Sequence, residues 1–136
     1  MRNVLRCRKL LAMVFLFLAL ALETSTIRAA QDSDAAINHA KQIMELSQQE
    51  KFEEIVAEFN SQMAAAVTLS QMKQSWAAIK AQFGDFKSFL DQKITSSAGG
   101  ITVVTLGCQF ENATFEMKTA FDSSNKIAGM GLRPRQ

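Results

Sequence analysis

Residues suited to catalysis or metal binding are scarce in this 136-residue sequence. It contains one histidine, His39, and two cysteines, Cys7 and Cys108. A serine–histidine–aspartate relay would have to use His39, whose polar neighbours Asn38 and Lys41 favour a position on the surface of a helix. We therefore expect no catalytic histidine, no metal site and no cofactor.

The remaining candidates for acid or base chemistry are carboxylates. They are Asp85, Asp91, Glu111, Glu116 and Asp122. Sequence spacing alone does not show whether any two of them meet in space. The sequence has no glycine-flanked serine elbow, no phosphate-binding glycine loop, no H-E-x-x-H and no C-x-x-C motif. We expect a protein that works by binding and assign no catalytic residue, with a small enzyme using pocket carboxylates as the alternative.

The N-terminus has the order of segments typical of a secretory signal peptide. Basic residues precede an uncharged apolar run from 10 to 22, and small residues follow at Ala29 and Ala30. The apolar run is shorter than the roughly 20 residues that span a membrane. We predict a signal peptide over residues 1–29 and one exported domain, secreted or periplasmic, over residues 30–136, with no membrane contact after cleavage.

The predicted leader also carries much of the positive charge. Five of the 15 basic residues and one of the 13 acidic residues precede residue 30, which leaves a formal charge of about −2 on the rest. The remainder has no run of basic residues to bind a phosphate backbone, so we expect no nucleic-acid partner. Cys108 has no partner cysteine after the leader, and we expect a small buried side chain on a strand, with an intermolecular disulfide or a reactive thiol as the alternative.

Helical periodicity dominates the first half of the predicted domain. Apolar residues recur at three- and four-residue steps from Ala36 to Ser47 and again from Phe52 to Phe59. A connection of small residues around Met63 separates them from a third helix, which begins with a capping box at Thr68 and ends at Gly84. Trp76 lies on the apolar stripe of this third helix.

After Gly84 the period changes to two, which is typical of strands. The predicted strands begin at Asp85 and cover 101–110, 114–121 and 126–132. The first of them places Phe89 on its polar side. Helices followed by four sequential strands predict an α+β fold, with N-terminal helices packed on one face of a four-stranded antiparallel meander.

An aromatic residue on the polar face of such a sheet is one candidate binding surface, and a pocket between helices and sheet is another. Eight phenylalanines, Trp76 and five methionines follow the leader, and so adaptable an interior could hold an apolar ligand. The candidate ligand-binding residues are Trp76, Phe83, Phe86, Phe89 and Phe110. The expected partner is an unidentified protein or a small apolar ligand. The alternative is that these side chains only fill the core.

Several of these residues also carry a resemblance to a known family. Phe52-Glu53, Trp76, Phe83-Gly84, Phe121-Asp122 and the segment from Lys126 to Met130 resemble a bacterial family of small exported domains, the domain of unknown function 3887. The resemblance covers roughly residues 35–132. In that family the domain occurs alone behind a signal peptide or fused to secreted hydrolases, which implies an accessory or binding role, or regulation of a hydrolase.

The resemblance defines no catalytic residues. Because the sequence ends at Gln136, we expect a domain without the fused hydrolase of some relatives. A helix-rich start and a curved sheet also suggest the cone-shaped nuclear transport factor 2-like and cystatin-like folds by analogy.

Overall fold

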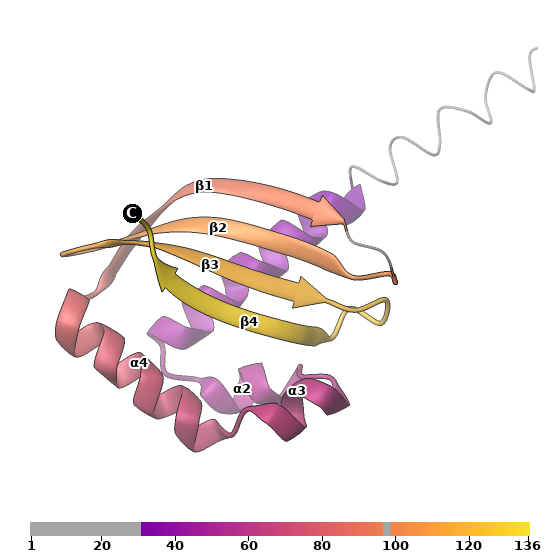
Figure 1. The fold of residues 1–136 in the computed structure, drawn as a ribbon, viewed down its shortest axis with the longest axis horizontal. Coiled ribbons are helices and arrows are strands. Elements are labelled where there is room, and N and C mark those ends of the chain that lie inside the picture. The colour runs from indigo at the N-terminus through magenta and orange to yellow at the C-terminus, as the bar shows by residue number, and fades with distance from the viewer. Residues whose placement is uncertain (1–30, 97–98) are drawn as a thin grey trace, which may run out of the picture. The chain divides into compact units, whose positions relative to one another are not determined.

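The computed structural model describes residues 31–96 and 99–136. The predicted signal peptide, residues 1–29, lies outside the described residues. Residues 36–136 form one compact unit. The architecture of this unit is helices followed by a four-stranded sheet (Figure 1), so the predicted α+β class is confirmed. The predicted likeness to cone-shaped folds stays a prediction.

Four helical segments precede the sheet. They span residues 31–48, Phe52–Ala57 (α2), Ser61–Ala66 (α3) and Leu69–Phe83 (α4). The prediction of a plain connection at α3 is wrong, because the Asn60 side chain accepts a hydrogen bond from the Met63 N–H at 2.9 Å and caps a short helix. This helix carries the buried side chain of Met63 into the core.

The predicted ends of α4 are confirmed. The Thr68 hydroxyl accepts from the Gln71 N–H at 3.2 Å, while the Gln71 carboxamide accepts from the Thr68 N–H at 2.9 Å. Gly84 ends the helix with a φ of +80°, and its N–H donates to the Lys80 carbonyl at 3.0 Å. A side chain would be strained at that φ, which explains the glycine.

The sheet is an antiparallel meander in the order β1-β2-β3-β4. Its strands are β1 (Phe86–Ser96), β2 (Thr102–Phe110), β3 (Thr114–Phe121) and β4 (Ile127–Pro134). β4 is longer than predicted because it continues through Pro134, after which the Arg135 N–H donates to the Thr114 carbonyl at 2.8 Å. The helices cover one face of this sheet, with the first helix crossing it obliquely (Figure 1).

The strand β1 is irregular, and this irregularity reverses one prediction. Its register against β2 shifts after Phe86 and again after Phe89. Phe89 pairs with the fully buried Cys108, lies against the core and has Lys41 5.6 Å from its ring centre. Phe89 is therefore on the helix side, and Leu90, at 51 % exposure, takes the solvent position instead.

The outer face of the sheet is polar. An ion pair crosses it from β1 to the C-terminal end, with Asp91 and Arg135 joined by two hydrogen bonds of 2.7 and 3.0 Å. The pair lies over Gly107, where an added Cβ would stand 2.8 Å from an Asp91 oxygen and 2.9 Å from an Arg135 nitrogen. The Arg135 guanidinium holds the pKa of Asp91 below its ordinary value.

Candidate functional site

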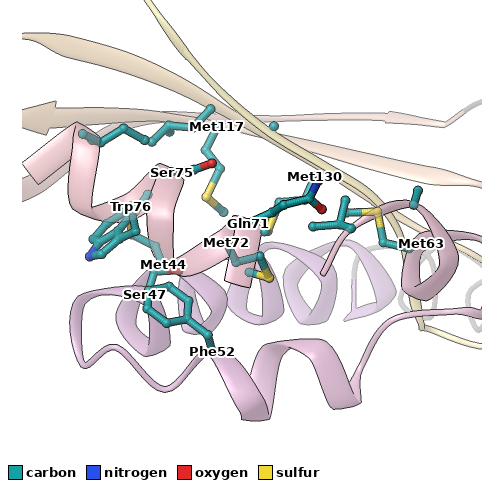
Figure 2. Close-up of a pocket in the computed structure, with 15 residues that line it drawn as sticks. Met44, Ser47, Phe52, Met63, Gln71, Met72, Ser75, Trp76, Met117 and Met130 are labelled. Atoms are coloured by element: carbon teal, nitrogen blue, oxygen red, sulfur yellow. The ribbon is translucent and has the colours of Figure 1, made fainter. Parts of the chain in front are cut away.

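A pocket of about 510 Å³ lies between the helices and the inner face of the sheet. Figure 2 shows side chains from both layers converging on it, including Met117 pointing from the sheet toward α4. The lining residues are Met44, Ser47, Phe52, Met63, Ala66, Val67, Gln71, Met72, Ser75, Trp76, Ile79, Met117, Met130, Gly131 and Leu132. Pockets for small molecules have volumes of about 300–1,000 Å³, so this one is large enough to hold a ligand.

Every methionine after residue 30 lines this pocket. They are Met44, Met63, Met72, Met117 and Met130. They come from the first helix, α3, α4, β3 and β4 respectively, so five elements each contribute one thioether. Each lies on the apolar face of its element and is buried or half-buried. Because methionine is flexible and polarisable, such a lining adapts to ligands of different shape.

The pocket reaches solvent at one side. Ala66, Gln71, Ser75 and Gly131 line it and are exposed residues, and they form its mouth. None of the described lining residues carries an ionisable side chain. The buried Ser47 hydroxyl already donates to the Ile43 carbonyl at 2.8 Å. The side chains inside the pocket are therefore mainly apolar, and the polar side chains of Gln71 and Ser75 lie at its mouth.

Trp76 separates the pocket from the aromatic part of the core. Its ring packs edge-on against Phe110 at 6.1 Å. The indole N–H is buried and has no hydrogen-bond partner among the described residues. Figure 2 shows this nitrogen at the end of the ring away from Met72. Trp76 thus contributes apolar ring surface to the pocket, and its N–H is not part of the lining.

Of the five predicted ligand-binding residues, the structure places Trp76 in the pocket and the other four elsewhere. Phe83, Phe86, Phe89 and Phe110 belong to an aromatic cluster packed against the core. In that cluster Phe110 is fully buried and lies 5.8 Å from Phe86, which in turn lies 4.9 Å from Phe89. These rings stabilise the fold next to the pocket and do not line it.

The single histidine lies outside the pocket. Its ring stacks on Phe121 at 4.6 Å, and its Nε2 contacts the Glu58 carboxylate. Its Nδ1 is buried without a partner among the described residues. His39 lies at the surface only in part, because Glu58 at the end of α2 and Phe121 at the end of β3 cover its ring and leave 16 % of the side chain exposed.

Of the candidate carboxylate residues, Asp85 and Glu111 lie side by side outside the pocket, because the Asp85 N–H donates to the Glu111 carboxylate at 3.3 Å and the Glu111 N–H donates to the Asp85 carbonyl at 3.0 Å. Asp91 pairs with Arg135, Glu111 with Lys87 at 2.8 Å, and the other three lie beside basic side chains or backbone N–H groups. The pKa of Glu111 is lowered, chiefly by the hydrogen bond from Lys87. The described residues contain no group of three or more histidine, cysteine, aspartate or glutamate side chains placed to hold a metal ion.

The matched family agrees with the resemblance seen in the sequence. The family described as protein of unknown function (DUF3887) matches residues 40–130, which is more than half of the chain. The chain belongs to the DUF3887 family. No curated protein and no solved structure matches it.

The matched part of this DUF3887 domain contains all five pocket methionines, since they lie between residues 44 and 130. None of the helices in the described part of the chain is both long and apolar enough to cross a membrane. Sequence reasoning noted the methionine content but not that these residues share one cavity. The available signal was that each methionine falls on the apolar side of its own helix or strand.

Proposed function

We propose that this DUF3887 protein is a non-catalytic binding domain that holds an uncharged apolar ligand in the methionine-lined pocket. The observation that carries the proposal is that all five methionines after residue 30 line one pocket whose lining has no ionisable side chain. Burying an unpaired charge there would be costly, which favours neutral ligands. The lining also has no carboxylate, so nothing in it favours an enzyme that uses pocket carboxylates.

A neutral fluorescent dye, N-phenyl-1-naphthylamine, tests the proposal. We expect saturable fluorescence enhancement with the purified domain, residues 30–136. The variant Ser75→Trp places a large ring at the mouth and should weaken dye binding about tenfold or more. Gln74→Trp is the matched control, because Gln74 is the exposed neighbour on α4 and does not line the pocket. Equal affinity in the two variants, or no saturable binding, would contradict the proposal.

The site of action that we propose is outside the cytoplasm. The support is the order of basic, apolar and small residues over positions 1–30. Expression of the full chain, followed by cell fractionation and N-terminal sequencing, tests this. We expect the released protein to begin at residue 30 or 31. Recovery of the uncleaved chain in the cytoplasm would refute export without bearing on the pocket.

A further inference from the structure

The strand β4 is one edge of the sheet, and its backbone groups alternate in direction. In an antiparallel pair, every second residue bonds to the neighbouring strand and the residues between direct N–H and C=O outward. The Arg135 N–H donates to the Thr114 carbonyl. At two-residue steps along the strand, the backbone N–H and C=O groups of Arg133 and Gly131 therefore also point toward β3. Met130 and Leu132 therefore direct their N–H and C=O groups to the free edge.

The same edge already pairs with one residue of this chain outside the sheet. The Ile127 N–H donates to the Glu58 carbonyl at 2.8 Å, and the Asn60 N–H donates to the Ile127 carbonyl at 2.9 Å. Phe59 thereby forms a parallel bridge with Ile127 before the chain turns into α3. Beyond this bridge, no backbone group within residues 31–96 or 99–136 bonds to the outward groups of Met130 and Leu132.

The unpaired part of the edge borders the pocket. Met130 and Leu132 line the pocket with their side chains, and the exposed Gly131 between them has no atom within 4 Å of the position that a Cβ would take. Backbone hydrogen-bonding groups and an apolar cavity thus lie side by side. This is the combination used when a peptide adds a strand to a sheet and places alternate side chains in pockets.

We propose that the ligand of this pocket is an extended apolar segment of a polypeptide, which pairs with β4 at Met130 and Leu132 and places a side chain among the methionines. This inference rests on the proposed function and specifies its ligand class. A free small molecule would use the cavity but leave the edge groups unpaired. A second copy pairing through its own β4 would present a folded sheet to the mouth and leave the cavity empty.

The variants Leu132→Pro and Leu132→Val test the pairing. Proline at position 132 removes an outward N–H without removing a ladder bond, and Pro134 already occupies an equivalent outward position on the same strand. Valine shortens the side chain but keeps the N–H. The probe is a capped peptide, Lys-Thr-Leu-Ser-Leu-Thr-Lys, with binding measured by calorimetry and folding checked by circular dichroism.

We expect the proline variant to bind the peptide about tenfold more weakly than the valine variant, since a hydrogen bond is lost. Because Leu132 lines the pocket, both substitutions should change dye affinity to a similar extent, and only the peptide affinity should differ between the two variants. A peptide N-methylated at both leucines should also bind at least tenfold more weakly to the unmodified protein, which provides a test even where the proline variant does not fold. Dye binding without peptide binding, or equal peptide affinity in both variants, overturns this inference and leaves the proposed function standing.

If the unmodified protein binds neither the dye nor the peptide, both proposals are overturned. A concentration-dependent dimer, seen by light scattering and abolished by Leu132→Pro, would assign the edge to a second copy and also overturn the peptide inference.

Discussion

The register shifts in β1 predict that two adjacent residues, Phe89 and Leu90, differ sharply in their contribution to stability. A regular strand from Phe86 would place Leu90 inward and Phe89 outward, because side chains alternate. In the structure Phe89 instead packs 4.9 Å from Phe86 and pairs with Cys108, while Leu90 is 51 % exposed. Phe89→Ala should therefore destabilise the domain more than Leu90→Ala does, which is the reverse of the order that the periodicity implies.

The expected magnitudes follow from these contacts. Truncating a fully buried phenylalanine costs about 3–5 kcal/mol, and Phe89 is half-buried. Roughly half of that value, with the Phe86 ring contact adding about 0.5–1.5 kcal/mol, gives about 2–4 kcal/mol for Phe89→Ala. Leu90→Ala removes an exposed side chain without a described partner and should cost under about 0.5 kcal/mol.

Chemical denaturation of the domain, followed by tryptophan fluorescence, measures both values, because Trp76 is the single tryptophan and is buried. In a thermal melt, the melting temperature of Phe89→Ala should be lower by roughly 10 °C or more, and that of Leu90→Ala should be nearly unchanged. If Leu90→Ala costs as much as Phe89→Ala, the irregular register is wrong and β1 is a regular strand with Phe89 on the polar face.

Three further predictions concern single residues. Burial raises the pKa of the Cys108 thiol from 9.0 to about 11. Ellman's reagent should therefore label this thiol slowly at pH 8 until denaturant is added. The free energy of unfolding should fall as the pH rises above 9, because the thiol of the unfolded chain ionises before that of the folded chain. Gly107→Ala should displace the ion pair on the outer face and raise the pKa of Asp91 toward its ordinary value in a carboxyl NMR titration, whereas Gly131→Ala, which meets open space, should not. Gly84→Ala should destabilise the domain by about 1–3 kcal/mol in a urea titration, because alanine is strained at a φ of +80°; unchanged stability would show that another conformation ends α4.

The elements set by local chemistry could be predicted from the sequence. The capping box at Thr68 and the glycine stop at Gly84 define α4 within a residue, since each depends on neighbours in the chain. The strand β3 has the predicted bounds, Thr114–Phe121, because its inward residues alternate regularly with polar ones. The order of four sequential strands followed from the short turns between them.

The features that depend on distant residues could not be predicted. The bulges in β1 exist because β2 and the first helix supply a place for Phe89, and no local pattern marks that place. The partial burial of His39 likewise depends on Phe121 and Glu58, which are far from it in the sequence. Aromatic residues were the predicted ligand-binding group, yet most of them pack together, and the cavity lies where the more flexible methionines meet.

Because five methionine thioethers line one pocket, this part of the molecule is especially sensitive to oxidation. Oxidation by peroxide converts methionine to its sulfoxide, which is polar. One such event would place a dipole inside an otherwise apolar chamber, and several would hydrate it. Damage that elsewhere in a protein is scattered over unrelated positions would here converge on the part of the molecule that meets its ligand.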